Sequence, residues 1–285
     1  TTHYDKVKEV EQNTLEMVMD WLSVGMDPGK STFYVQSQIP YITELYAMLA
    51  MICGVPRAER IPTLKDKIQD MGVGDNYSVG LLGYPVLMAA DILMFKATKV
   101  PVGEDQLSHI ELTRELARRF NFLYGEFFQE PDPVISKTSR LVGLDGDRKM
   151  SKSLDNCIYL SDDVGQVNKR VMSMFTDPNR IRADIPGKVE GNPVFIYHDA
   201  FNKNTAEIDD LKDRYRTGNV GDVEVKKKLS AAINELLEPI REKRSEYESR
   251  PDDVRDILRE GTKRAHDKAH ENMDQIISAM GLFKP

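Results

Sequence analysis

Short strand-like runs alternate with longer helical patterns over the first 125 residues, and this alternation constrains the fold more than any other feature. Apolar residues at helical spacing predict helices over 6–24, 41–53, 79–95 and 106–121. The runs Thr32–Gln36 and Lys99–Val102 predict short buried strands. Because parallel strands are joined through helical crossovers, the alternation predicts a parallel sheet covered by helices on both faces.

The pattern changes near residue 160. Residues 54–76 are rich in Gly, Pro and charges and predict a loop with a short helix. Beyond residue 160 we expect only helices, each with one apolar stripe, over 161–175, 206–215, 222–247, 252–260 and 262–280. The chain therefore reads as an α/β protein, with a Rossmann-like parallel-sheet domain over residues 1–160 and an α-helical domain over residues 161–285.

Composition and charge narrow the class of protein. Apolar residues make up 40% and charged residues 30%, an ordinary globular balance. The formal net charge of -7 excludes a globally basic nucleic-acid binder, so any RNA contact needs local basic patches. The runs Lys226–Lys228 and Arg241–Arg244 are basic, but such runs are usually solvated helix faces.

No segment predicts targeting or membrane insertion. The opening TTHYDKVKEVEQNT is charged and has no apolar core. The most apolar stretch, 79–95, is interrupted by Pro85 and Asp91, which favours a buried helix over a membrane span. Cys53 and Cys157 fit no metal-binding spacing, so we expect two free thiols in a reducing cytoplasm.

The most specific word in the sequence is Lys149-Met150-Ser151-Lys152-Ser153. Two flexible ammonium groups three residues apart can close on negative charge that develops on a phosphate leaving group. The alternative interpretation is a solvated loop of lysine and serine, which composition alone would favour.

A second pattern places Tyr84, Met88 and Asp91 at positions i, i+4 and i+7, on one face of a helix. A buried carboxylate needs a hydrogen-bond donor. An indole ring offers one N–H donor and no acceptor, so Asp91 suits it, with Met88 against the ring face. Pairing of Asp91 with an internal arginine or a backbone N–H is an equally open alternative.

A third pattern lies where a predicted strand passes into a helix, at Val100-Pro101-Val102-Gly103-Glu104-Asp105-Gln106. Ligands of such sheets bind beyond the carboxyl ends of the strands, where Gly103 would allow close approach and an acidic side chain could accept ribose hydroxyls. Favourable interaction of Glu104 and Asp105 with the helix N-terminus explains the same residues without a ligand.

The run GLLGYPVLMAADIL, continued by VPVGEDQLSHIELTRELARRFN and KMSKS, resembles the bacterial tryptophanyl-tRNA synthetases, which are class I aminoacyl-tRNA synthetases. The likeness extends along the whole chain and includes STFYVQSQIP and TDPNRIR. It implies a tryptophan–tRNA ligase that activates L-tryptophan with ATP and charges tRNA(Trp). It also implies Mg²⁺ carried by ATP without a dedicated protein site, a cytoplasmic homodimer, a catalytic domain over 1–160 and an anticodon-binding domain over 161–285.

The resemblance also implies residue roles. On the tryptophan side, Tyr84 and Gln106 would hold the ammonium group and Asp91 would accept the indole N–H, while Met88, Val100 and Val102 would wall the pocket. On the ATP side, the implied contacts are Lys67 at a phosphate, Gly103, Glu104 and Asp105 at the ribose, Leu141 on adenine, and Lys149, Met150, Ser151, Lys152 and Ser153. Lys149 and Lys152 would be the catalytic pair.

One departure and two alternatives remain. None of the five histidines lies in the H-I-G-H-like word that class I synthetases carry, so we expect the first βα units to lie outside these 285 residues. A tyrosyl-tRNA synthetase shares KMSKS but typically has Gln where this chain has Met88. A synthetase paralogue that binds ATP or RNA without charging tRNA is the other alternative, although KMSKS is intact.

Overall fold

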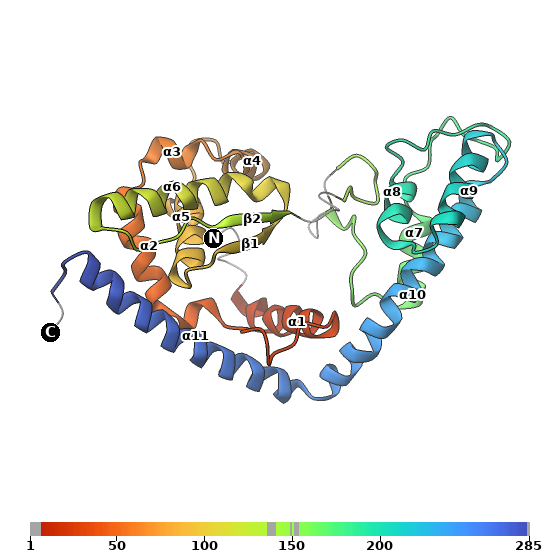
Figure 1. Cartoon of the computed structure of the whole chain (residues 1–285). Coiled ribbons are helices and arrows are strands. Elements are labelled where there is room, and N and C mark those ends of the chain that lie inside the picture. Colours follow the sequence, from red (N-terminus) through yellow and green to blue (C-terminus); the bar gives the residue numbers. More distant parts are fainter. Residues whose placement is uncertain (1–6, 136–140, 149, 151–153, 284–285) are drawn as a thin grey trace. The chain divides into compact units, whose positions relative to one another are not determined.

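The computed structural model describes residues 7–135, 141–148, 150 and 154–283 (Figure 1). The chain forms two compact units, each described here by itself. Unit 1 comprises residues 1–15, 27–139 and 252–285, and unit 2 comprises residues 16–26 and 140–251. These units differ from the expected division at residue 160, because residues 16–26 belong to unit 2, the main boundary falls near residue 140, and the last 34 residues belong to unit 1.

Unit 1 contains most of the α/β pattern. The chain begins with η1 (Val7–Glu9) and α1 (Val10–Ser23), and α1 continues into the residues of unit 2. The later elements are η2 (Gln36–Gln38), α2 (Pro40–Ile52), α3 (Val55–Glu59), α4 (Pro62–Met71), α5 (Val79–Met94), β1 (Lys99–Val102), η3 (Glu104–Gln106), α6 (Leu107–Tyr124), β2 (Asp132–Ile135) and α11 (Pro251–Ala279). Two helices, α3 and α4, thus occupy the stretch expected to hold one.

The described sheet is small and parallel. Strands β1 and β2 pair in parallel, with Lys99 opposite Asp132 and Val102 opposite Ile135. Helix α6 is the crossover between them, as expected for a parallel pair. The expected strand 99–102 is confirmed, whereas β2 was not expected, because Pro133 within it argues against a strand.

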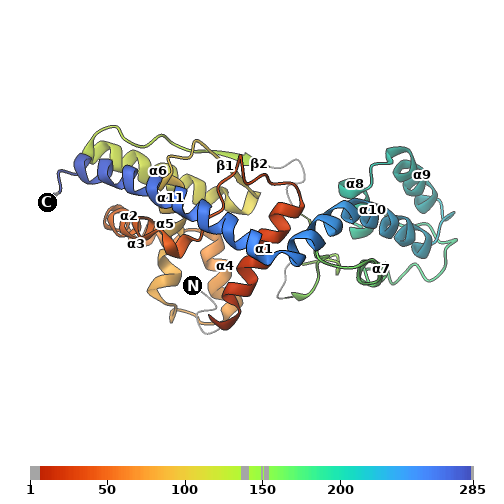
Figure 2. The ribbon, with the colours of Figure 1, turned by 90° about the horizontal axis from the view of Figure 1, so that it is seen from below.

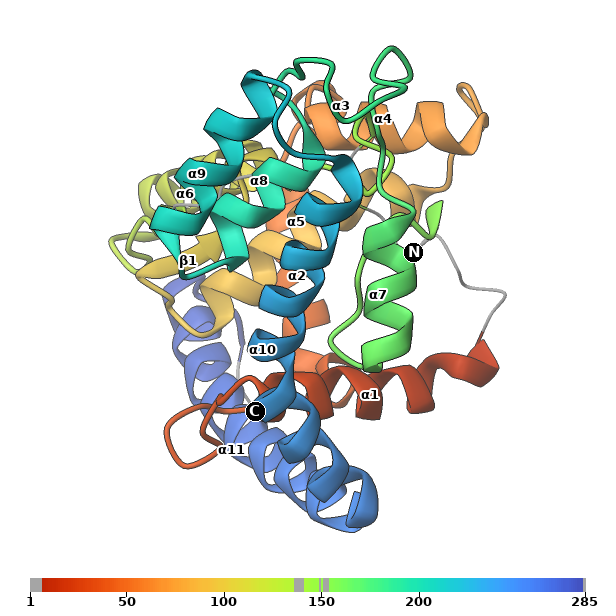
Figure 3. The same cartoon turned by 90° about the vertical axis from the view of Figure 1, so that its right-hand side faces the viewer.

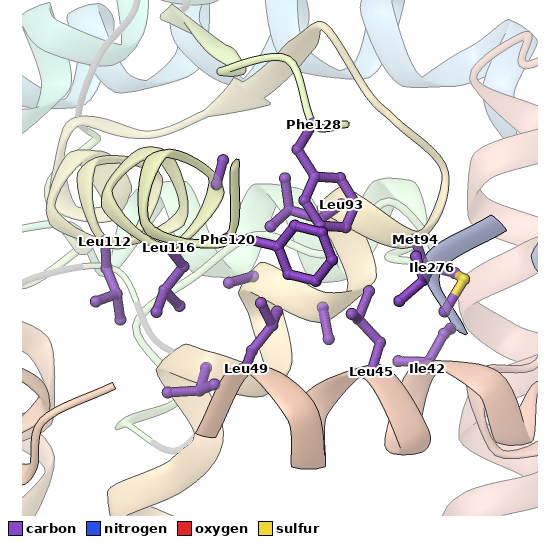
Figure 4. Packing of buried hydrophobic residues seen from close by; sticks show 14 of the residues in the cluster. Ile42, Leu45, Leu49, Leu93, Met94, Leu112, Leu116, Phe120, Phe128 and Ile276 are labelled. Atoms are coloured by element: carbon purple, nitrogen blue, oxygen red, sulfur yellow. The ribbon is translucent and has the colours of Figure 1, made fainter. Parts of the chain in front are cut away.

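Helices α2, α5, α6 and α11 bury one apolar core in unit 1 (Figure 4). Its labelled side chains are Ile42, Leu45 and Leu49 of α2, Leu93 and Met94 of α5, Leu112, Leu116 and Phe120 of α6, Phe128, and Ile276 of α11. Ser78 starts α5 by accepting a hydrogen bond from the Leu81 N–H at 3.1 Å. This core fixes α5, which carries three of the candidate site residues.

The segment Thr32–Gln36 is not a strand, which corrects the expectation. Among the described residues it pairs with no strand, and the Val35 N–H donates instead to Thr262 Oγ1 of α11 at 3.0 Å. Helix α11 is also continuous through Gly261, where two helices were expected (Figure 2). A Cβ at Gly261 would lie 1.9 Å from the Phe33 carbonyl oxygen, so glycine serves this close approach and does not end the helix.

Unit 2 is helical. Helices α7 (Val164–Met172) and α8 (Pro193–Phe201) pack on α10 (Asp222–Ser249), and α9 (Thr205–Arg216) packs on α8 (Figure 3). Helix α8 was not expected. No described helix is long and apolar enough to cross a membrane.

Two residues of the basic runs are buried, which corrects the expectation of solvated faces. Lys226 Nζ donates to the carbonyl oxygens of Met172 and Met174, at the end of α7. Arg244 pairs with Glu16 and Asp20 in unit 2. Both side chains therefore stabilise the fold of unit 2.

Candidate active site

Helix α5 presents Tyr84, Met88 and Asp91 at the spacing that places them on one face. All three are half-buried, whereas Pro85, Val86, Ala89 and Ala90 on the same helix are buried in the core. The buried face of α5 packs in the core of unit 1, and this packing fixes the opposite face, which carries Tyr84, Met88 and Asp91.

Asp91 is held by a residue from a distant segment. The Gln36 Nε2 lies 2.8 Å from Asp91 Oδ1 and 2.8 Å from Oδ2, so one amide group binds both carboxylate oxygens. Burial raises the pKa of Asp91, and the hydrogen bond from Gln36 opposes this shift by favouring the carboxylate. Tyr34 lies close enough for the Asp91 charge to add to the burial that raises the pKa of Tyr34 to about 12. This carboxylate is orientated, and its remaining lone pairs can accept a further N–H donor.

Tyr84 belongs to a cluster of three polar side chains from three helices. Its hydroxyl oxygen lies 3.1 Å from Thr63 Oγ1 of α4 and 3.2 Å from His109 Nε2 of α6. Thr63 Oγ1 and His109 Nε2 are themselves 3.2 Å apart. The Tyr84 and His109 rings lie 5.4 Å apart between centroids, tilted by 46°. The Tyr84 hydroxyl is thus fixed from two sides.

The end of β1 carries the other unit 1 residues. Val100 and Val102 are half-buried on β1, and Gly103 leads into the single 3₁₀ turn of η3, where Glu104 and Asp105 are exposed. The Gln106 Nε2 donates to Asp105 Oδ2 at 2.9 Å. The strand-end position expected for these residues is therefore observed, and Gln106 is tied to its neighbour Asp105.

Lys67 is exposed on α4, four residues after Thr63. Residues at i and i+4 share a helical face, so Lys67 projects from the same side of α4 as the side chain that contacts Tyr84. Lys67, the candidate phosphate-binding residue, therefore lies on the side of α4 that faces the Tyr84 cluster.

The remaining candidates belong to unit 2. Lys149, Ser151, Lys152 and Ser153 lie outside the described residues, while Leu141 and Met150 pack against the apolar core of unit 2. The residues on either side of the KMSKS word are joined, because the Asn156 Nδ2 donates to Asp145 Oδ2 at 3.0 Å and the Leu144 N–H donates to the Asn156 carbonyl at 2.9 Å. The Asn156 side-chain bond is the largest cause that lowers the pKa of Asp145, and the backbone N–H groups of Asp147 and Arg148 add to it.

A cavity of about 500 Å³ lies beside these flanking residues in unit 2. Its lining includes Asp145, Asn156, Lys169 and Arg170. Arg170 is neutralised by Asp155 and Asp162, whose carboxylate oxygens each lie 2.9 Å from its guanidinium. Among the described residues, no group of three or more His, Cys, Asp or Glu side chains is arranged to hold a metal ion.

Three residues were missed by sequence reasoning: Gln36, Thr63 and His109. Gln36 is the last residue of the run Thr32–Gln36, and its place at the end of a predicted strand is a signal that could have found it. Thr63 and His109 lie 21 residues before and 25 residues after Tyr84, and no local pattern joins them.

The chain is similar to known proteins over most of its length. The family model "tRNA synthetases class I (W and Y)" matches residues 1–238. The tryptophan–tRNA ligase of Borreliella burgdorferi is 52% identical over 98% of this chain and 80% of its own length. That of Treponema pallidum is 50% identical over 99% of this chain and 84% of its own length.

A solved structure gives the same result. The tryptophanyl-tRNA synthetase of Campylobacter jejuni complexed with ADP and tryptophan superimposes with a TM-score of 0.81 at 34% identity, covering 97% of this chain and 85% of its own. The family model, the two relatives and the solved structure identify the same family. The chain therefore belongs to the class I tRNA synthetases and, among them, to the tryptophan–tRNA ligases.

Proposed function

We propose that this chain activates L-tryptophan with ATP through the α5 face and the KMSKS word, and then transfers the tryptophanyl group to tRNA(Trp). The single observation that carries the residue assignment is the Gln36–Asp91 pair, which holds a half-buried carboxylate with acceptor capacity to spare. The neighbour from Campylobacter jejuni, complexed with ADP and tryptophan, supports both small-molecule substrates.

On the tryptophan side, Asp91 accepts the indole N–H, and Met88 on the same face packs against the ring. Val100 and Val102 complete the apolar walls from β1. Tyr84 and Gln106 accept hydrogen bonds from the ammonium group. The tryptophan carboxylate is thereby left free to attack the α-phosphate of ATP.

On the ATP side, Gly103, Glu104 and Asp105 contact the ribose, Leu141 packs on adenine, and Lys67 contacts a phosphate. Lys149 and Lys152, with Met150, Ser151 and Ser153, stabilise the charge on the departing pyrophosphate. ATP would carry Mg²⁺, which would neutralise charge on its phosphates without a dedicated protein site. The bonds among Asp145, Leu144 and Asn156 support this role by fixing the residues that flank the KMSKS word.

The residue assignment is tested by Asp91→Asn in the protein expressed from its complete coding sequence. An amide is neutral, so the charge-assisted bond to indole is lost even if its oxygen faces the ring. We expect kcat/KM for tryptophan to fall roughly tenfold or more, with the KM for ATP unchanged. Unchanged tryptophan kinetics, or an equal loss for ATP, would show that Asp91 has a structural role only.

We further propose that the protein is a cytoplasmic homodimer that pairs through the α2–α6 side of unit 1. Met51 and Phe122 on these helices are 71% and 88% exposed. A cavity of about 390 Å³ beside Phe122, next to the end of α2, is lined by Cys53, Arg57 and Phe122, among others. Exposed apolar side chains beside a hollow are typical of a protein interface.

Light scattering tests the dimer. The unsubstituted protein should have the mass of two chains at micromolar concentration, and Phe122→Glu should shift it towards one chain. A single-chain mass for the unsubstituted protein would contradict the proposal.

A further inference from the structure

We propose that His109 and Thr63 direct the hydroxyl proton of Tyr84 away from the substrate, so that Tyr84 presents a lone pair to the ammonium group of tryptophan. The inference rests on the proposed function, which places Tyr84 at that ammonium group. It assigns Thr63 and His109 as positioning residues for substrate binding.

The geometry of the cluster supports this role. Three polar atoms from α4, α5 and α6 lie within 3.1–3.2 Å of one another, and Tyr84 has both Thr63 Oγ1 and His109 Nε2 within hydrogen-bond distance. Each member comes from a different helix. The arrangement therefore depends on the packing of the fold, and the Tyr84 hydroxyl does not rotate freely.

The number of donors and acceptors in the cluster determines where the Tyr84 hydroxyl proton points. A phenol has one proton to donate and two lone pairs, whereas an ammonium group can only donate. Tyr84 can therefore bind the ammonium group only if its own proton is given to another acceptor. Thr63 Oγ1 and a deprotonated His109 Nε2 are the two acceptors in the cluster, and either one leaves a lone pair for the substrate.

His109 must be neutral for this to work, and its surroundings favour the neutral ring. The side chain is 1% exposed, and Nδ1 has no hydrogen-bond partner among the described residues. An imidazolium would bury a charged N–H without an acceptor and would stand close to the substrate ammonium, one cation beside another. The neutral ring with its proton on Nδ1 still buries one N–H without an acceptor, but this N–H is uncharged, and the ring places no second cation beside the substrate.

The ionisable groups that act on the cluster come from two neighbouring elements. Burial lowers the pKa of His109, and Asp105 of η3 opposes this by attracting the proton. Burial raises the pKa of Tyr84, and Asp66 of α4 adds to it. The direction for His109 keeps the ring neutral near pH 7, and acidification should convert Nε2 into a donor aimed at Tyr84.

The test compares tryptophan with indole-3-propionate, which has the same ring and carboxylate but no ammonium group. Dissociation constants for both ligands are measured by titration calorimetry on the protein expressed from its complete coding sequence. The ratio of the two constants isolates the ammonium contribution, because a general loss of the pocket weakens both ligands.

Four variants make the comparison specific. His109→Leu removes the Nε2 acceptor. Thr63→Val removes the Oγ1 acceptor with little change of side-chain shape. His109→Gln keeps a neutral acceptor near Nε2 that cannot be protonated. Ser108→Ala is the matched control, because Ser108 Oγ is also buried and has no partner among the described residues.

The expected result is a roughly tenfold loss of tryptophan affinity in His109→Leu, a smaller loss in Thr63→Val, and unchanged binding of indole-3-propionate in both. Because burial lowers the pKa of His109, tryptophan should lose its affinity advantage over indole-3-propionate in the unsubstituted protein as the pH is taken progressively below the ordinary histidine pKa of about 6.5. The ratio should stay flat in His109→Gln. The inference is overturned if both ligands weaken equally, if neither changes, or if His109→Gln keeps the pH dependence. Failure of the unsubstituted protein to bind tryptophan would instead overturn the proposed function.

Discussion

Gln36 and Asp91, 55 residues apart, share a hydrogen-bonded pair in which one amide nitrogen lies 2.8 Å from both carboxylate oxygens. The pair joins the first residue of η2 to the C-terminal end of the α5 face that carries Tyr84, Met88 and Asp91. It orientates the carboxylate and opposes the effect of burial on its pKa. Asp91 is therefore prepared as an acceptor before any ligand arrives.

Gln36→Leu tests this preparation. Without the amide, Asp91 loses its orientation, and its pKa should rise because only burial then acts on it. We expect the KM for tryptophan to rise about threefold to tenfold, a range reduced from that of a buried bond because Gln36 is exposed. Gln38→Leu, on the same short turn, is the control and should leave the KM unchanged; equal effects of the two variants would refute the pair's role.

Gly261→Ala tests the contact between α11 and the segment that leads to Gln36. The new Cβ would meet the Phe33 carbonyl oxygen at 1.9 Å, so backbone must move. We expect the free energy of unfolding to fall by about 1–3 kcal/mol and tryptophan to bind more weakly. Gly80→Ala in α5 is the control, since its nearest neighbour is Ser78 Oγ at 3.7 Å, and it should be neutral or gain up to about 1 kcal/mol. Equal stability of the two variants in denaturant titrations would contradict this account.

Asn156→Ala removes the bond that joins the two sides of the KMSKS word. The KM for ATP in pyrophosphate exchange should rise about threefold or more, with the KM for tryptophan unchanged, because α5 is untouched. Asp147→Asn, an exposed residue of the same turn, should leave both constants unchanged. A rise in the KM for tryptophan alone would contradict the assignment of the residues that flank KMSKS to the ATP side of the site.

His198 should make unit 2 sensitive to acid. The side chain is buried, and its Nε2 lies 3.1 Å from the Val225 carbonyl oxygen. Burial is the largest cause that lowers its pKa, so the unfolded chain binds the proton more readily. Its stabilising contribution is therefore complete above about pH 6.5 and is lost as pH falls.

Denaturant titrations between pH 7.5 and pH 5 measure this loss. The slope due to one such histidine can reach about 1.4 kcal/mol per pH unit, and His198→Gln should make the pH dependence shallower. His266→Gln changes a half-buried histidine of α11 in unit 1 and is the control that should keep the original slope. An unaltered slope in His198→Gln would refute the assignment.

The sequence predicted the elements whose signals are local. Helix α5 follows from the most apolar stretch of the chain, and β1 from four residues before Gly103. Strand β2 could not be found, because Pro133 within it is a sequence signal against a strand. Gly261 reads as a helix break in sequence, yet the close approach of Phe33 explains it. Tertiary contacts overrode local propensity in each missed case.

The candidate site divides in the same way. Tyr84, Met88 and Asp91 were found because helical spacing relates them, and KMSKS because it is a continuous word. Gln36, Thr63 and His109 were missed because their roles depend on the contacts that η2, α4 and α6 make with α5. Side-chain partners that lie 20 or more residues apart leave no periodic trace.

Amino-acid-dependent exchange of pyrophosphate into ATP tests the central claim most directly. The protein expressed from its complete coding sequence is assayed with tryptophan, tyrosine or phenylalanine at equal concentration. The account predicts rapid exchange with tryptophan and exchange lower by a factor of about 10⁴ or more with the other two, because neither side chain offers an indole N–H to Asp91. Exchange supported best by tyrosine, or no exchange with any of the three, would contradict it.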